Sequence, residues 1–324
     1  MGGAGMKRMI GRLLRQQVRL AKRFVERLDP EPGPYNSINP AFAHASINKT
    51  FTTLMSEHRG LYPQYTWGVL QAAHLATTLG IRRISVIEFG VAGGNGLVAL
   101  ERASERAEAE SGVQIDVHGF DTGRGLPPPT DFRDLPHLYR PSEYRMDVDE
   151  LRPRLKRAKL HIGLVADTLK EFLESKPAPI GFASFDLDLY SSTVDAFTIF
   201  EQKSHDLTLP RVHCYFDDIM GLSFSEFTGE RRAIEEFNTR HERRKIAPIF
   251  GLKYFLPPKF SNQQWAEMFY LAHMFDHPLS DRPDGLTLNA QRPLAQHLTR
   301  SVAPLCVPLA DFVVSYAPSV AALI

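Results

Sequence analysis

The sequence predicts an α/β fold built around a parallel β-sheet. Three observations support this: five short apolar runs recur along the chain, helix-like segments lie between them, and every run ends in a polar or acidic residue. Strands that alternate with helices are typical of parallel sheets, whose ligand sites lie at the carboxyl ends of the strands. We therefore expect the five polar run ends to meet along one edge of the sheet.

The first apolar run leads into a turn that is rich in glycine. Residues 84–87 precede Glu88, four glycines follow between positions 90 and 96, and a helical segment begins at Leu97. Glycine permits tight dihedral angles and lets a ligand lie against bare backbone. The alternative is an ordinary connection that binds nothing. A dinucleotide site fits less well, because the turn lacks the Gly-x-Gly-x-x-Gly spacing.

The other four runs each end in at least one aspartate. Their acids are Asp121, Asp167, Asp186, Asp188, Asp217 and Asp218. Asp121 stands 31 positions after Gly90, where an acid can accept hydrogen bonds from both hydroxyls of an adenosine ribose. Asp167 is followed by Thr168 and has an ordinary helix N-cap as its alternative interpretation.

Beyond Asp218 the pattern predicts a helix and then a hairpin. Residues 229–237 have the mixed charges of an exposed helix, and the runs 246–256 and 265–275 are typical of two strands. Paired antiparallel, these strands would close the sheet.

Residues 122–144 predict a long loop, because they contain five prolines. Long loops in compact domains are commonly lids or binding loops. This one leaves the same sheet edge as Asp121, so we expect it to cover a substrate. Its basic residues Arg124, Arg133 and Arg140 either help to select an acidic substrate or are simply solvated.

Taken together, these residues resemble the class I S-adenosylmethionine-dependent methyltransferases, and within them the macrocin (TylF-type) O-methyltransferase family. The motifs that carry the resemblance are Glu88-Phe-Gly-Val-Ala-Gly-Gly94, Asp121-Thr-Gly-Arg-Gly-Leu-Pro127, Asp167-Thr-Leu169, Asp186-Leu-Asp-Leu-Tyr-Ser-Ser-Thr193 and Asp217-Asp218. The resemblance spans residues 62–256. Family members usually carry Gly in place of Leu187 and Glu in place of Ser191, which weakens any inference about the substrate.

The resemblance implies a Rossmann-like class I methyltransferase fold, with a central, mostly parallel seven-stranded sheet, helices on both faces and an antiparallel C-terminal hairpin. It also implies a cofactor site. S-adenosylmethionine would lie against the backbone of Gly90, Ala92, Gly93 and Gly94, with Asp121 on its ribose, Asp167 near its adenine and Glu88 organising the turn. In the region before the first strand, Tyr62, Tyr65 and Trp67 either contact cofactor or substrate or belong to the core.

The later aspartates predict a metal site. Asp186 and Asp188 are two apart, so on an extended strand both would point to one face, and Asp217 and Asp218 end the neighbouring strand. Carboxylates this close repel one another unless a cation offsets the repulsion, and Mg²⁺ prefers such oxygen ligands. We expect Asp188, Asp217 and Asp218 to bind Mg²⁺, with Asp186 a fourth ligand or the general base. Asp186 and Asp188 are thus the predicted catalytic residues.

Composition limits the alternatives. The chain of 324 residues is 43% hydrophobic, enough for one substantial core with appendages. Its net charge of +1 gives no general attraction to nucleic acid. Two cysteines exclude a disulfide framework, and no run is long and apolar enough to span a bilayer. We expect a cytoplasmic protein.

The N-terminal segment 7–28 predicts a basic amphipathic helix, with eight Lys and Arg residues against the single acid Glu26. Such a helix packs on its own domain or on a second subunit, or lies on an anionic membrane surface. We divide the chain into this helix and its linker (1–34), a helical cap (35–79), the methyltransferase domain (80–275) and a proline-rich, then apolar extension (276–324). The two appendages make a homo-oligomer an expectation.

Three functions follow from the sequence. The favoured one is a Mg²⁺-dependent O-methyltransferase acting on a hydroxyl of a sugar or glycosylated natural product. The second is a methyltransferase with another acceptor, such as a catechol-like or lipid-linked hydroxyl. The third is a non-catalytic module that binds a partner through its terminal segments. The intact acid cluster counts against the third.

Overall fold

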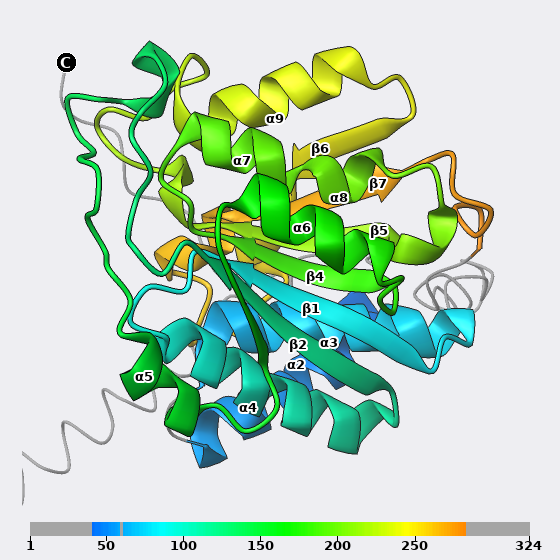
Figure 1. The fold of residues 1–324 in the computed structure, drawn as a ribbon. Helices are drawn as coiled ribbons and strands as arrows, with labels where there is room; N and C mark the ends of the chain where they lie inside the picture. The colour runs from blue at the N-terminus through cyan, green and yellow to red at the C-terminus, as the bar shows by residue number, and fades with distance from the viewer. Residues whose placement is uncertain (1–40, 59–60, 283–324) are drawn as a thin grey trace, which may run out of the picture. The chain divides into compact units, whose positions relative to one another are not determined.

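A computed structural model describes residues 41–58 and 61–282. Within them, seven strands form one sheet in the order β3-β2-β1-β4-β5-β7-β6 (Figure 1). The strands are β1 (Arg83–Phe89), β2 (Gln114–Asp121), β3 (Lys159–Ile162), β4 (Ile180–Phe185), β5 (Thr208–Phe216), β6 (Arg244–Pro248) and β7 (Phe269–Met274). Strands β1 to β5 are parallel, and β7 pairs antiparallel with both β5 and β6.

Helices cover both faces of the sheet (Figure 1). One face carries α2 (Ala41–Glu57), α3 (Pro63–Leu79) and α4 (Asn95–Ser111), and the other carries α6 (Val165–Glu174), α7 (Tyr190–Ala196), α8 (Thr198–Glu201) and α9 (Gly229–Arg240). Shorter helical segments are α5 (Val148–Leu151), η2 (Phe132–Asp134), η3 (Arg152–Arg154), η4 (His205–Leu207), η5 (Asp217–Ile219), η6 (Leu252–Tyr254) and η7 (Gln264–Glu267). The predicted Rossmann-like fold, with its antiparallel C-terminal hairpin, is confirmed.

A row of phenylalanines crosses the sheet at the carboxyl ends of its central strands. In the strand register Phe120 of β2 pairs with Phe89 of β1, Phe89 with Phe185 of β4, and Phe185 with Phe216 of β5. Neighbouring ring centroids are 5.2, 5.3 and 4.6 Å apart, and all four side chains are fully buried. Because the rings are in register, the residues that follow them also form a row.

The hairpin and the helix before it differ from the prediction in detail. The strands β6 and β7 are shorter than the predicted runs 246–256 and 265–275, because a turn through left-handed Gly251 ends the first and η7 precedes the second. Helix α9 was expected to be exposed. Instead it buries Glu230, Ala233 and Phe237 in its packing against the rest of the domain.

The predicted N-terminal helix 7–28, its linker, and the extension from residue 283 onward lie outside the described residues. The proposed division into 1–34, 35–79, 80–275 and 276–324 therefore stays a prediction, as do the membrane contact and the homo-oligomer. Among the helices in residues 41–58 and 61–282, none has the length and apolar character needed to cross a bilayer.

Gly90 offers a test of how closely the first turn packs. Its φ is +81°, and a Cβ there would lie 1.7 Å from the carbonyl oxygen of Asp186. Gly112 has a similar φ of +73° but nothing within 4 Å. We predict that Gly112→Ala costs about 1–2 kcal/mol of unfolding free energy, the usual penalty for left-handed backbone, and that Gly90→Ala costs clearly more. Urea unfolding measures both, and equal losses would contradict the close packing.

Two histidines on β2 and β3 make stability depend on pH. His118 and His161 place ring nitrogens 3.1 Å apart and pack against Phe172. Burial, then the charges of His161 and Lys159, lower the pKa of His118 to about 3. An unfolded histidine titrates near 6.5. The unfolded chain therefore binds a proton that the folded chain does not, and stability falls as the pH drops from 6.5 toward 3.

We predict that His118→Phe reduces the loss of unfolding free energy between pH 7 and pH 5. Exposed His137→Gln is the control and should lose as much as the unaltered protein. Urea titrations of the unaltered protein and both variants at the two pH values give the six numbers required. An unchanged pH dependence in His118→Phe would show that His118 is not the titrating group.

Candidate functional site

A cavity of about 450 Å³ opens at the carboxyl ends of the central strands. This volume lies within the range of roughly 300–1,000 Å³ that is usual for small-molecule and cofactor sites. The residues that follow the phenylalanine row, Gly90, Asp121, Asp186 and Asp217, all line it. The expectation that the polar run ends meet at one edge is confirmed for β1, β2, β4 and β5.

The charged side chains that line this cavity are all acidic. The aspartates that line it are Asp121, Asp186, Asp188, Asp195, Asp217 and Asp218, and no Lys, Arg or His stands among its described lining residues. Such a cavity favours a cationic ligand and disfavours the phosphates of a dinucleotide. The electrostatics therefore agree with the glycine spacing in weighing against a nicotinamide cofactor.

The glycine turn contributes two of its four predicted residues to the cavity. Gly90 and Ala92 line it, whereas Gly93 and Gly94 do not. Gly94 is the N-cap of α4 with φ +76°, and a Cβ there would collide with Leu151, so this glycine serves packing. Ala92 has φ +43°, a strained value for a residue with a side chain. Strain of this kind is common where a backbone is shaped for a ligand.

Asp121 links the two turns that border the cavity. Its Oδ2 accepts the backbone N–H of Val91 and of Ala92, both at 2.9 Å, and its Oδ1 accepts the N–H of Gly123 at 2.7 Å. A carboxylate offers about four acceptor positions. Asp121 therefore shapes the turn and retains capacity for a ligand hydroxyl.

Glu88 lies beneath the turn rather than in the cavity. It is 2% exposed, and its Oε1 accepts a 2.6 Å hydrogen bond from the hydroxyl of Tyr65. Burial raises the pKa of Glu88 to about 8. A Cβ on Gly96 would come within 1.9 Å of this oxygen, so Gly96 lets α4 begin directly against Glu88. Tyr65 and Trp67 are buried, as the core interpretation of these aromatics expects.

Asp186, Asp217 and Asp218 form the tightest acid cluster, called here the acid trio. Each offers a carboxylate oxygen, and these oxygens lie within 4.8 Å of one another. The prediction that Asp186 and Asp188 share a face of an extended strand was wrong. Strand β4 ends at Phe185, and Asp188 takes φ +59° in a turn where its N–H donates to Oδ2 of Asp218 at 2.9 Å.

The geometry therefore brings Asp186, not Asp188, together with Asp217 and Asp218. Asp188 lines the same cavity but stands outside the trio. Its assignment as a metal ligand stays a prediction that these contacts do not favour.

Burial and mutual repulsion dominate the electrostatics of the cluster. Burial first, then the charges of Asp218 and Asp217, raise the pKa of Asp186 to about 9. The pKa values of Asp188 and Asp218 are also raised, chiefly by burial. In the described part of the chain no basic side chain forms an ion pair with any of them. The cluster thus has the composition of a divalent-cation site.

The loop 122–144 covers the cavity as expected, with Leu126, Pro127, Pro128, Thr130 and Tyr144 among its lining residues. In Figure 1 it descends along the left side of the sheet toward α5. It is firmly anchored. Asp134 is fully buried and accepts the N–H and hydroxyl of both Thr130 and Ser191, at 2.6 to 3.0 Å.

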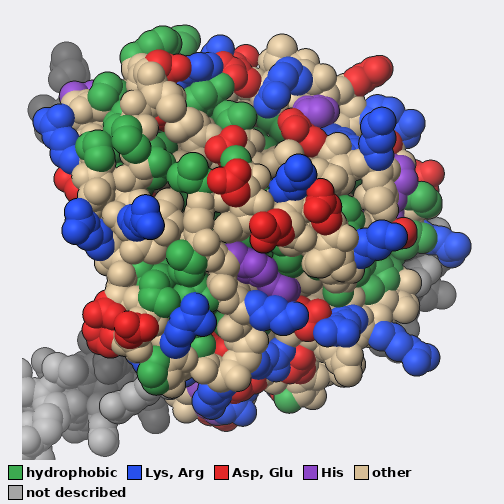
Figure 2. Space-filling model, in the orientation of Figure 1, with side chains coloured by type: hydrophobic (Ala, Val, Ile, Leu, Met, Phe, Trp, Pro, Cys, Tyr) green, Lys and Arg blue, Asp and Glu red, His purple; other side chains and the backbone are tan. Residues whose placement is uncertain are grey.

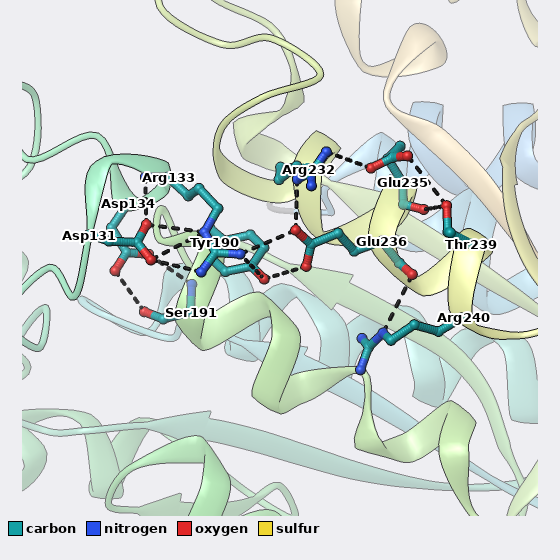
Figure 3. A network of polar contacts seen from close by, with 10 residues as sticks. All are labelled: Asp131, Arg133, Asp134, Tyr190, Ser191, Arg232, Glu235, Glu236, Thr239 and Arg240. Atoms are coloured by element: carbon teal, nitrogen blue, oxygen red, sulfur yellow. Dashed lines mark hydrogen bonds and ion pairs between the residues drawn. The ribbon is translucent and has the colours of Figure 1, made fainter.

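A second anchor joins this loop to α7 and α9 (Figure 3). Arg133 donates to Asp131 at 2.7 Å and to Tyr190 at 2.8 Å, and it reaches Glu236 at 3.1 Å. Tyr190 in turn donates to Glu236 at 2.5 Å. These contacts occupy Arg133, which therefore belongs to a fixed wall and is not a free arginine for an acidic substrate.

Asp167 does not line the cavity. It is exposed in the first turn of α6, whose N-cap is Leu164, so the N-cap interpretation of Asp167 was wrong. Leu164 and Val165 line the cavity there, and across from them Asp195 of α7 also lines it. The adenine role of Asp167 stays a prediction.

Two acids near the site have no signal in the sequence, and Tyr144 is marked only by its place in the loop 122–144. Tyr144 and Asp195 line the cavity, and Glu230 hydrogen-bonds to the backbone of Asp218. None belongs to a run that ends a strand. Their positions depend on how the loop, α7 and α9 pack onto the sheet.

We predict that Asp134→Ala loosens the loop. Four hydrogen bonds to a buried carboxylate are lost, at a cost of about 3 kcal/mol or more of unfolding free energy. Amide hydrogen exchange should rise across residues 126–140. Asp131→Ala is the control, since its pair with Arg133 is partly exposed and worth about 1 kcal/mol or less. Similar exchange in both variants would contradict the anchoring role of Asp134.

Comparisons with known proteins add structural likenesses. No protein-family model and no curated protein matches this sequence. Among solved structures, the calicheamicin methyltransferase CalS11 is 19% identical to this chain, with a TM-score of 0.42. The match covers 64% of this chain and 88% of that chain. A second structure of CalS11, described as a TDP-rhamnose 3'-O-methyltransferase, is 18% identical, with a TM-score of 0.35. The match covers 73% of this chain and 91% of that chain.

An O-methyltransferase from Bacillus cereus in complex with SAH is 14% identical, with a TM-score of 0.38. The match covers 79% of this chain and 97% of that chain. Because these TM-scores are low, we base no functional assignment on the likenesses.

Proposed function

We propose that this chain is an S-adenosylmethionine-dependent O-methyltransferase that requires a divalent cation, with Mg²⁺ the expected one. Its acceptor would be a hydroxyl of a sugar or glycosylated natural product. The observation that carries the proposal is the cavity itself, which joins a glycine turn, Asp121 and the acid trio, with no basic residue among its described lining.

The cofactor half of the proposal rests on the first two strands. S-adenosylmethionine is a sulfonium cation, and an acidic cavity with no basic side chain among its described lining residues suits it. Asp121 has an acceptor position left for the ribose hydroxyls after its three backbone hydrogen bonds. The exposed backbone at Gly90 and Ala92 would lie against the cofactor.

The acids of β4 and β5 divide into two roles. Asp186, Asp217 and Asp218 would hold the cation, since their oxygens already converge. A bound divalent cation would act as a Lewis acid that lowers the pKa of the acceptor hydroxyl. Asp188 stands outside the trio in the same cavity, and burial raises its pKa toward the neutral range where a general base works best. It would accept the hydroxyl proton.

The mouth of the cavity favours an acceptor with an apolar part. Tyr144 and Leu164 line the cavity and are 59% and 51% exposed. Farther along the loop Phe132 is 70% exposed, and Figure 2 shows hydrophobic side chains over the upper left, where Figure 1 draws the loop. A glycosylated or aromatic scaffold fits such a rim better than a free sugar, so other hydroxyl acceptors remain the second candidate.

We predict that two substitutions separate cofactor binding from cation binding. Asp121→Asn should weaken S-adenosylhomocysteine binding by about tenfold or more, because hydrogen bonds to a charged group contribute about 1.5–3 kcal/mol. It should leave Mg²⁺ binding within about twofold. Asp217→Ala should abolish Mg²⁺ binding and turnover while S-adenosylhomocysteine affinity stays within a few-fold. Calorimetric titrations of both ligands on both variants provide the comparison.

The wild-type protein sets the reference for these titrations. Micromolar S-adenosylhomocysteine binding is expected with and without Mg²⁺, and methyl transfer to glycosylated acceptors is expected only with the cation. If neither condition shows cofactor binding, the methyltransferase assignment fails. Methyl transfer that persists in excess chelator would reject the cation requirement alone.

A further inference from the structure

Glu230 is the one acid in the first turn of α9, and its surroundings are unusual for a helix glutamate. The side chain is fully buried. Its Oε2 accepts the backbone N–H of Asp218 at 3.1 Å, and its Oε1 has no hydrogen-bond partner. No basic side chain in residues 41–58 and 61–282 forms an ion pair with it.

This arrangement is costly for the fold alone. A buried acceptor without a partner destabilises the folded state, and an ionised one does so more strongly. The adjacent Arg231 pairs with Glu226 rather than with Glu230. The partial positive charge of the α9 N-terminus favours a carboxylate, but it leaves Oε1 unpaired. Packing and helix capping therefore do not explain a glutamate at this position.

The charges that act on Glu230 come from the acid trio. Burial first, then the charges of Asp218, Asp186 and Asp217, raise the pKa of Glu230 above its usual range. Since Glu230 hydrogen-bonds to the backbone of Asp218, it lies directly behind the trio and does not line the cavity. Four carboxyl groups share one small region, and no described basic residue offsets them. A divalent cation on the trio is the group that would balance this charge.

We propose that Glu230 is a positioning residue of the cation site. Its carboxyl group holds Asp218 by accepting the backbone N–H of Asp218. It also adds a fourth acid behind the three that face the cavity. The site then selects a hard divalent cation such as Mg²⁺ or Mn²⁺ over Na⁺ or K⁺. The inference rests on the proposed function only in taking the acid trio as the place where the cation binds.

A purely structural role makes the opposite prediction. If Glu230 only caps or packs α9, Glu230→Gln should lower the melting temperature and leave metal affinity unchanged. Glutamine keeps the shape of the side chain and an oxygen for the Asp218 N–H, but it cannot take up a negative charge when a cation binds. If Glu230 serves the cation, the metal-free melting temperature should be maintained or raised, while metal affinity falls.

The experiment is a calorimetric titration of Mn²⁺ into the full-length protein, with melting temperatures measured alongside. We expect Glu230→Gln to weaken Mn²⁺ binding by about 10- to 100-fold, the usual effect of losing a residue that supports metal ligands. Glu235→Gln is the matched control. Glu235 lies on the same helix, its side chain is 49% exposed, and it pairs with Arg232. The Mn²⁺ affinity of the Glu235→Gln variant should stay within about twofold of wild type.

Mn²⁺ affinity within about twofold of wild type in Glu230→Gln would overturn the inference, as would a wild-type protein that binds no Mn²⁺. A parallel titration with S-adenosylhomocysteine separates the two proposals. Cofactor binding without Mn²⁺ binding would reject the cation site and Glu230 with it, but keep the cofactor assignment. Mn²⁺ binding that depends on Glu230 without cofactor binding would keep this inference and reject the methyltransferase.

Discussion

The row of four phenylalanines is the constraint on which the site depends. Phe120, Phe89, Phe185 and Phe216 meet in register across β2, β1, β4 and β5, and each is fully buried. Burial of one such ring contributes about 1.5–3 kcal/mol. A slip of one residue in any strand would turn its ring to the other face and break the row. The core thereby fixes the height at which Gly90, Asp121, Asp186 and Asp217 leave the sheet.

Near the ends of the central strands the chain holds carboxyl groups that no described basic side chain pairs. The pKa of Asp186 is raised to about 9 and that of Glu88 to about 8, mainly by burial. Ala92 and Asp188 add backbone strain, with φ of +43° and +59°. The stable core tolerates these local costs, and such costs are commonly found where a site is shaped for a ligand. A cation at the acid trio would relieve the largest of them.

The loop 122–144 completes the site as a wall and not as a hinged cover. Asp134 ties it to α7, and Arg133 ties it to both α7 and α9. Asp188 precedes α7 and donates its N–H to Asp218, and Glu230 of α9 accepts the N–H of Asp218, so the same two helices that anchor the loop also flank Asp218. An acceptor would therefore enter beside Tyr144 and Leu164 without a large loop movement.

The sequence by itself determined the sheet, the glycine turn and the meeting of Asp121, Asp186, Asp217 and Asp218, because parallel strands end at a common edge whatever surrounds them. Only the tertiary structure decided where Asp188, Asp195 and Glu230 lie. Asp188 lies in the turn that follows the end of β4 at Phe185, and the other two reach the site through the packing of α7 and α9. Helix placement depends on contacts between residues distant in the chain, and no local pattern records those contacts.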